Sequence, residues 1–131
     1  MTAGGAREAE GGGMEIVLHP GAHCTDAGAI AAYLADNADA LARGEVVAPP
    51  PEHFRRPVHA ALQELRGSVA SPERESALIE TLCEGAPGPV RRIVLSHDSL
   101  MGSASRILEA AGAYPVFPAR LHALRNLFPR Q

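Results

Sequence analysis

The stretch Met14–Leu34 reads MEIVLHPGAHCTDAGAIAAYL, and its pattern decides the fold. It opens with an apolar run, Met14–His19, whose β-branched residues are typical of a buried strand. The loop HPGAHCTDAG follows, and apolar residues at helical spacing begin directly after it. A strand that passes through a short loop into a helix is the opening unit of parallel α/β sheets.

The helix after this loop has one apolar face and recognisable signals at both ends. Thr25 or Asp26 is the expected N-cap, because either side-chain oxygen can accept a hydrogen bond from a first-turn amide. Gly44 is expected to end the helix in a left-handed conformation. The inward face is formed by residues at spacings of four, four and three, namely Ile30, Leu34, Ala38 and Leu41.

The remaining elements continue the alternation of strands and helices. A short strand is expected at Glu45–Ala48, because prolines follow it and proline cannot donate to a sheet ladder. A buried strand is expected at Val90–Ser96. Ser71 and Pro72 form a helix start, with proline at the first helical position. The predicted helices are Pro57–Arg66, Pro72 to about Gly85, Ser103–Ala111 and Pro118–Phe128, and their expected inward residues include Val58, Leu62, Leu65, Leu78, Ile79, Leu82, Leu121, Leu124 and Phe128.

The order β-α-β-α-α-β-α-α predicts the α/β class, with a three-layer arrangement of a parallel sheet between flanking helices. Three strands are few against the usual five or six, roughly, so the sheet is expected to be incomplete. Residues 1–13 are rich in Gly and Glu and are expected to form a disordered leader, so the domain is expected to span residues 14–131. Met14 is a candidate for the true start of the protein.

Composition narrows the classes of function. The formal net charge of −3 gives no basic footprint, so no nucleic-acid partner is expected. All 12 basic residues are arginine, which excludes Schiff-base chemistry and a phosphate-loop lysine from this chain. No apolar run approaches the roughly 20 residues of a membrane span, and two cysteines make no disulfide framework. A cytoplasmic protein without a membrane partner is therefore expected.

The loop after the first strand has two competing interpretations. A helix N-terminus favours an anion, Gly21 would let the backbone approach it, and His23 and Thr25 could contact it. Asp26 opposes this, because its carboxylate competes for the same amides. The ATP-type signature GxxxxGK[ST] does not fit. A plain strand-to-helix turn explains the same residues equally well.

The chain contains three segments in a characteristic order: VLHPGAHCTDAGAIAAYLADNADALARG, IVLSHDSLMG and YPVFPARLHALRNLF. Together they resemble sulfotransferases that use the sulfate donor PAPS, whose first strand leads into an HKTGTT-like loop and a helix. The second segment resembles the family's strand that ends in Ser-Ser-Glu, and the third resembles the helix before its next strand. The residues that match the opening pattern are His19, Gly21, His23, Thr25, Asn37, Leu41 and Gly44.

The resemblance implies a P-loop-type α/β fold, of which this chain comprises the N-terminal part, and PAPS or PAP as the nucleotide. It implies a role for Asp98, which stands where the family has a glutamate that acts as base on the acceptor hydroxyl; His97 is the neighbouring alternative base. A plainer interpretation is that Ser96 and Asp98 cap the turn after their strand. The implied donor-binding residues are Gly21, Ala22, His23, Cys24, Thr25, Asp26 and Ala27.

The departures from the family pattern point to a degenerate donor loop. Cys24 replaces the lysine that contacts the donor's 5′-phosphate, and Asp26, Ala27 and Gly28 replace small hydroxyl-bearing residues. The strand that carries an arginine and a serine for the 3′-phosphate has no counterpart in the sequence. Sulfuryl transfer needs positive charge on the leaving phosphate, so we expect weak nucleotide binding and impaired or absent activity. The alternative is a non-catalytic anion-binding or protein-interaction module, including a homodimer through an open sheet edge.

Two further patterns carry weaker hypotheses. His19, His23, Cys24 and Asp26 form an HxxxHCxD cluster, but the spacing is no recognised zinc pattern and no metal site is expected. Cys24, at a helix N-terminus, is also a candidate for a reactive thiol, whereas Cys83 is expected to be a buried small hydrophobe. The paired cations Arg55–Arg56 and Arg91–Arg92 fit solvated edges or a contact to an acidic ligand.

Overall fold

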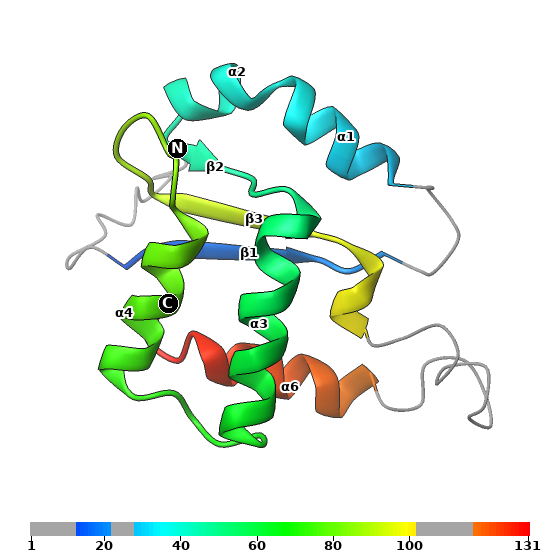
Figure 1. Cartoon of the computed structure of the whole chain (residues 1–131), viewed down its shortest axis with the longest axis vertical. Coiled ribbons are helices and arrows are strands. Elements are labelled where there is room, and N and C mark those ends of the chain that lie inside the picture. Colours follow the sequence, from blue (N-terminus) through cyan, green and yellow to red (C-terminus); the bar gives the residue numbers. More distant parts are fainter. Residues whose placement is uncertain (1–12, 22–27, 102–116) are drawn as a thin grey trace, which may run out of the picture.

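The computed structural model describes residues 13–21, 28–101 and 117–131 of the chain (Figure 1). It confirms the α/β class. The predicted helix Ser103–Ala111 and most of the expected leader lie outside the described residues. The elements are β1 (Glu15–His19), α1 (Ala29–Asp36), α2 (Ala38–Arg43), β2 (Val46–Val47), α3 (Pro51–Leu65), α4 (Pro72–Leu82), β3 (Arg92–Ser96), the 3-10 helix η1 (Asp98–Met101) and α6 (Phe117–Leu127).

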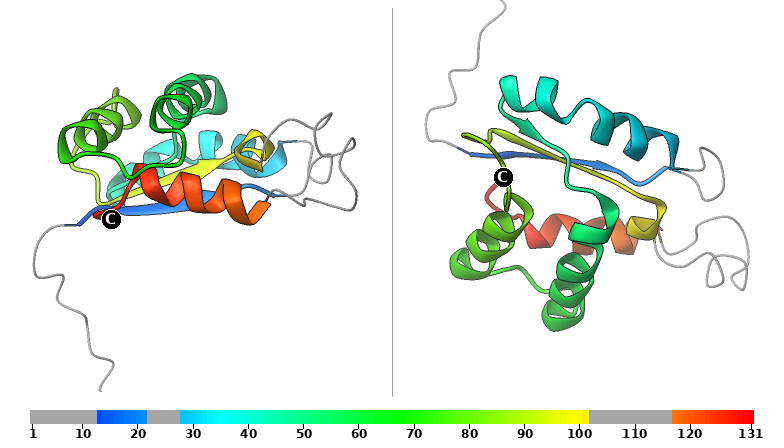
Figure 2. Two further views of the ribbon diagram at one scale, coloured as in Figure 1. Left: turned by 90° about the horizontal axis from the view of Figure 1, so that it is seen from below. Right: turned by 45° about the horizontal axis from the view of Figure 1, so that its top comes forward.

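The sheet has three parallel strands in the order β1-β3-β2. β3 therefore lies between two strands that precede it in sequence, and in the register Ile16 faces Ile93 and Leu18 faces Leu95. Parallel neighbours need crossover connections, and helices supply them here. In the view along the edge of the sheet, α1 and α2 cover one face while α3, α4 and α6 cover the other (Figure 2, right).

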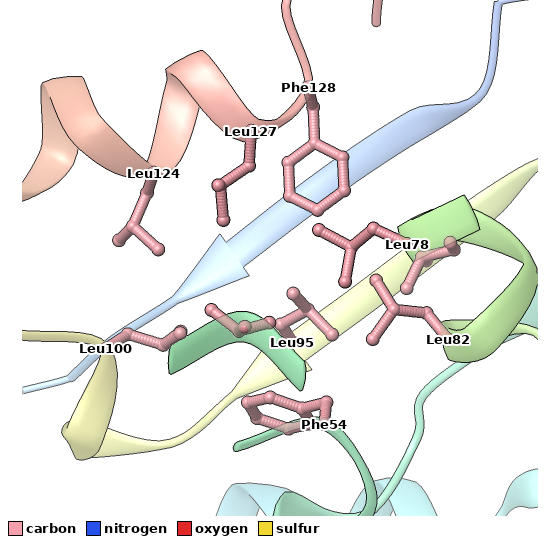
Figure 3. Packing of buried hydrophobic residues seen from close by; sticks show 10 residues of the cluster. Phe54, Leu78, Leu82, Leu95, Leu100, Leu124, Leu127 and Phe128 are labelled. Carbon is pink, nitrogen blue, oxygen red and sulfur yellow. The ribbon is translucent and has the colours of Figure 1, made fainter. Parts of the chain in front are cut away.

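The hydrophobic core occupies the face covered by α3, α4 and α6 (Figure 3). Ile93 and Leu95 of β3 have no exposed surface, and Ile16 and Leu18 of β1 pack against the same cluster. Because side chains alternate along a strand, Val94 faces the other layer, and it is only half-buried. The remaining core residues come from the helices, from η1 and from the residue directly after α6: Phe54, Val58, Leu78, Leu82, Leu100, Leu124, Leu127 and Phe128.

The layer of α1 and α2 is packed much less tightly, and it departs from the prediction. One continuous helix was expected, but the helix breaks at Asn37, whose side-chain Nδ2 donates to the Tyr33 carbonyl at 2.8 Å. Neither short helix contains a buried residue, and Ile30, expected to face inward, is 42% exposed. The predicted left-handed stop at Gly44 is wrong: its φ is −91°, and Glu45 takes the left-handed conformation at φ +59°.

α3 begins at Pro51, six residues before the predicted start at Pro57. Pro51 lies in the first turn, where its missing N–H is not needed. Pro57 lies inside the helix, where its missing N–H removes one bond of the ladder while the packing of its neighbours holds the helix together. The late predicted start left out Phe54, a fully buried core residue.

α4 and α6 follow the sequence signals closely. Ser71 caps α4 by accepting a hydrogen bond from the Arg74 amide at 3.3 Å, and Leu78 and Leu82 are buried as expected. In α6, Leu124 is buried, but Leu121 is 36% exposed, so its predicted inward orientation is wrong. Leu127 has 1% exposure and takes the inward position instead.

A buried carboxylate attaches the end of the chain to the packed layer. Glu75, in the first turn of α4, is 1% exposed and accepts hydrogen bonds from Arg130 Nη1 at 2.7 Å and Gln131 Nε2 at 3.0 Å. Burial raises the pKa of the Glu75 carboxyl, but the hydrogen bonds from Arg130 and Gln131 outweigh it, so the pKa lies below its usual value. Gln131 Oε1 also accepts a hydrogen bond from the Met14 amide at 2.5 Å.

Candidate functional site

The carboxyl ends of β1 and β3 meet at one edge of the sheet, because the two strands are parallel neighbours. His19 ends β1, Ser96 ends β3, and the two residues are register partners. His19 Nδ1 lies 2.8 Å from Ser96 Oγ, and the His97 amide donates to the His19 carbonyl at 3.2 Å. These two contacts hold the carboxyl ends of β1 and β3 together, where the chain leaves each strand for the following loop.

A small cleft of about 60 Å³ opens at this edge. Its volume is about that of two water molecules, so the described residues alone enclose space for an ion or for one end of a larger ligand. Both ends of the first loop contribute to the cleft, together with the ends of the two strands and α1. The lining residues are His19, Pro20, Gly21, Gly28, Ala31, Ser96, His97 and Asp98.

Two glycines set the backbone at the ends of the first loop. Gly21 has φ +59° and Gly28 has φ +79°, both in the left-handed region that residues with a Cβ rarely adopt. A Cβ on Gly21 would meet His19 Cε1 at 3.9 Å, an ordinary contact, so a substitution there would act through backbone strain. Gly28, which has no side chain to donate or accept a capping hydrogen bond, is the N-cap of α1, so the prediction of Thr25 or Asp26 at that position is wrong.

His97 and Asp98, the two candidate bases, both line the cleft. His97 Nδ1 lies 3.3 Å from Asp98 Oδ1, and both side chains are partly exposed. Ser96 is buried, and its hydroxyl contacts His19 across the two strands. The Ser96 hydroxyl, which was expected to cap the turn after its strand, thus joins the ends of β1 and β3. The sequence offers one signal for this contact, because His19 and Ser96 both stand at the end of a predicted strand.

The other predicted donor-loop residues cannot be placed. Ala22, His23, Cys24, Thr25, Asp26 and Ala27 lie outside the described residues, so their role in nucleotide binding stays a prediction. Of the HxxxHCxD cluster only His19 is described. Among residues 13–21, 28–101 and 117–131, no three His, Cys, Asp or Glu side chains lie close enough to share a metal ion. Within the same ranges, no helix combines the length and the apolarity that a membrane crossing requires.

Three further expectations concern charged and thiol groups. Arg91 pairs with Glu45 at 3.5 Å and Arg92 with Glu15 at 2.7 Å, at exposed positions where such pairs contribute little to stability. Cys83 is half-buried against the core, and burial raises the pKa of its thiol. Arg55 and Arg56 line a larger cavity beside the cleft, together with Arg120, whose place at a cavity the sequence did not reveal.

The charge available at the cleft is small. Among the residues that the structure describes, the ionisable groups that line it are two imidazoles and one carboxylate, and none is an arginine. Protonated imidazoles could contact an anion there, and Asp98 or His97 could accept a proton from a hydroxyl. No family model, curated protein or solved structure matches this chain.

Proposed function

We propose that the chain is a sulfotransferase-like domain that holds PAPS or PAP weakly at the carboxyl edge of β1 and β3, and that transfers sulfate poorly or not at all. The observation that supports it is the convergence of both ends of the HPGAHCTDAG loop with Ser96, His97 and Asp98 on one cleft. In open parallel sheets, ligands bind in the crevice outside the carboxyl ends of the strands.

The order of the elements supports the same location. β1 passes through its loop into α1, and Gly28, the N-cap residue of that helix, borders the cleft. First-turn amides and the helix dipole favour an anionic group at such a place. A nucleotide would extend well beyond the described cleft, with one phosphate or the sulfuryl group at the strand ends.

Weak binding and poor transfer follow from the missing positive charge. The chain contains no lysine, and Cys24 stands at the position where the resemblance implies one. Removal of one donor that stabilises developing charge costs about 3 kcal/mol, or roughly a hundredfold in rate. General-base catalysis by Asp98 or His97 would typically raise the reaction rate 10²–10⁴-fold. A base acts on the acceptor, however, and leaves the negative charge on the departing phosphate uncompensated.

Titration calorimetry with PAP tests the donor site. We expect a dissociation constant in the high micromolar range for the unmodified chain and a clear weakening in Gly21→Val, because valine strains the left-handed backbone at the cleft. Gly67→Val is the matched control, since Gly67 has φ +84° in the turn after α3, remote from the cleft. No binding at millimolar PAP, or equal weakening in both variants, would contradict the proposal.

A gain-of-function variant tests whether the missing positive charge in the loop is what weakens nucleotide binding. Cys24→Lys restores the ammonium group and should strengthen PAP binding about tenfold or more, the usual effect of one charge-assisted hydrogen bond. Gln63→Lys, on the exposed side of α3, adds the same charge elsewhere and should leave the affinity unchanged. If both lysines act alike, general charge rather than the loop governs nucleotide binding.

The outer edge of β1 favours a second function, self-association. β1 ends the sheet as the described residues form it, and a groove of about 370 Å³ lies beside it, lined partly by Ile16, Leu18 and Leu124. The Glu15 amide donates to the carbonyl of Arg91, the residue directly before β3, so by alternation the Ile16 and Leu18 amides point outward. A two-fold axis at the centre of β1 would pair two such edges and would place Glu15 opposite His19 of the other copy.

Hydrogen exchange at several protein concentrations tests this association. If two chains pair through β1, the Ile16 and Leu18 amides become protected as concentration rises, while the inward Val17 amide is protected throughout. Sedimentation equilibrium should show a dimer over the same range. Unchanged exchange at Ile16 and Leu18 up to millimolar protein would exclude this edge as the interface.

A further inference from the structure

A cavity of about 640 Å³ lies between the first half of α3, η1 and the start of α6. The three elements meet on one side of the molecule in both orientations (Figure 1; Figure 2, right). The cavity is distinct from the cleft at the strand ends, because no residue lines both. Its size falls within the roughly 300–1,000 Å³ of small-molecule sites and far exceeds the space needed by an inorganic ion.

One wall of the cavity is a polar stripe along α3. Glu52, Arg55, Arg56 and His59 stand at positions i, i+3, i+4 and i+7, which share one face of a helix. Phe54 and Val58 lie on the neighbouring face and are buried in the core, as the close-up shows for Phe54 (Figure 3). The core therefore fixes the helix while the stripe faces the cavity.

The charges around this cavity are unbalanced. Among the described lining residues, Arg120 of α6 joins Arg55 and Arg56, and the one carboxylate is that of Glu52. Among the residues that the structure describes, neither Arg55 nor Arg56 forms an ion pair with a carboxylate. Glu52 lies in the first turn of α3, where its charge complements the helix dipole. The cavity is thus a local excess of positive charge in a chain of formal net charge −3.

Arg120 is held in place at the opposite wall. Its Nε donates to the Leu100 carbonyl at 2.9 Å, which connects α6 to η1. A guanidinium that is already held in place loses little additional freedom when it contacts a ligand. Planar guanidinium groups suit the oxygen pairs of carboxylate, sulfate and phosphate, and the aliphatic stems of Arg55 and Arg56 offer apolar surface to the body of a ligand.

We propose that the cavity between α3, η1 and α6 binds a small organic anion, a molecule whose carboxylate, sulfate or phosphate group contacts Arg55, Arg56 and Arg120. The size of the cavity suits an organic body, and the neighbouring guanidinium groups of Arg55 and Arg56 favour a negative charge. The inference does not rest on the proposed nucleotide site. η1 carries Asp98 at its start and contributes Leu100 to the cavity wall.

Nuclear magnetic resonance titration with 2-naphthyl phosphate tests the proposal. Amide shifts should move in α3 between residues 52 and 59 and at Arg120, with binding in the micromolar to low millimolar range. Arg55→Gln/Arg56→Gln keeps two exposed helix-forming residues and should weaken binding about tenfold or more. Arg43→Gln/Arg66→Gln, at exposed positions outside the cavity, removes the same charge and should leave binding unchanged.

Comparison ligands separate the ligand classes. Tighter binding of 2-naphthyl sulfate or 2-naphthoate than of the phosphate would identify the preferred anionic group and support the site. Equal affinity for uncharged 2-naphthol, equal affinity for inorganic phosphate, or equal weakening in both double variants would overturn it. Competition between PAP and 2-naphthyl phosphate would overturn the claim of a separate site. PAP binding that depends on Gly21 but not on Arg55 and Arg56 would support two sites.

Discussion

The two faces of the sheet differ in how completely they are covered. The face toward α3, α4 and α6 carries the whole hydrophobic core and the buried Glu75 carboxylate. The face toward α1 and α2 has helices without one buried residue, and Tyr33 on α1 is 67% exposed. Stability should therefore come from one layer, while α1, whose N-terminal end borders the cleft, can change with little effect on folding.

The largest expected effect contrasts two aromatic residues from the two layers. Phe54→Ala in α3 should lower the free energy of unfolding by about 3–5 kcal/mol, because it empties a fully buried site. Tyr33→Ala in α1 should change it by less than about 0.5 kcal/mol, because most of the ring is already in water. Urea unfolding followed by circular dichroism measures both, and similar losses would contradict the difference between the layers.

A smaller effect should come from the buried carboxylate. Glu75→Gln should destabilise the protein by about 1–2 kcal/mol, discounted because Arg130 is partly exposed. The folded pKa of Glu75 lies below its unfolded value, so its contribution is present above about pH 4.5 and is lost as the pH falls through the folded pKa. Urea unfolding between pH 2 and pH 7 should show this acid loss in the wild type and a smaller loss in the variant.

Glu64→Gln serves as the control for that experiment. Glu64 pairs with Arg74, and the hydrogen bond from Arg74 lowers the pKa of its carboxyl, but about half of each side chain is exposed to solvent. We expect no measurable change in the free energy of unfolding from this substitution. A larger loss from Glu64→Gln than from Glu75→Gln would show that burial does not decide the strength of these pairs.

The smallest of the three contrasts is expected at the strand ends, where Ser96 contacts His19. Ser96→Ala should cost about 1 kcal/mol, since Ser96 is buried and His19 loses a partner at 2.8 Å. Ser68→Ala, which removes an exposed hydroxyl that donates to Leu65, should cost less. If the two serines contribute equally to unfolding stability, the contact between the strand ends is no stronger than a surface hydrogen bond.

Short sequence patterns predicted those helices and strands whose ends are set by residues close by in the sequence. The apolar runs at β1 and β3, and the Ser71-Pro72 start of α4, were readable because strand burial and helix capping act over a few residues. The break between α1 and α2 at Asn37 and the continuation of α3 through Pro57 could not be predicted from such patterns. In both, tertiary packing or a side-chain contact overrode the helix pattern.

The candidate site was predictable only in part. Asp98 and His97 were expected at the end of a strand, and the structure brings them to the cleft with Gly21. The contact of His19 with Ser96 depends on strand order, because β3 could have paired elsewhere in a sheet. The cationic cavity depends on where α6 crosses α3, which no spacing along the chain encodes.

The hydrogen bond between Gln131 and Met14 brings residues 14 and 131 side by side. A short linker could therefore join residue 131 to residue 14 in a variant that omits residues 1–13, and that variant could be opened at the exposed turn that contains Gly67. Such a circular permutant would place β1 in the middle of the gene and would keep the Glu75 contacts internal. Its native fold would show that the order of synthesis is not needed to assemble this sheet.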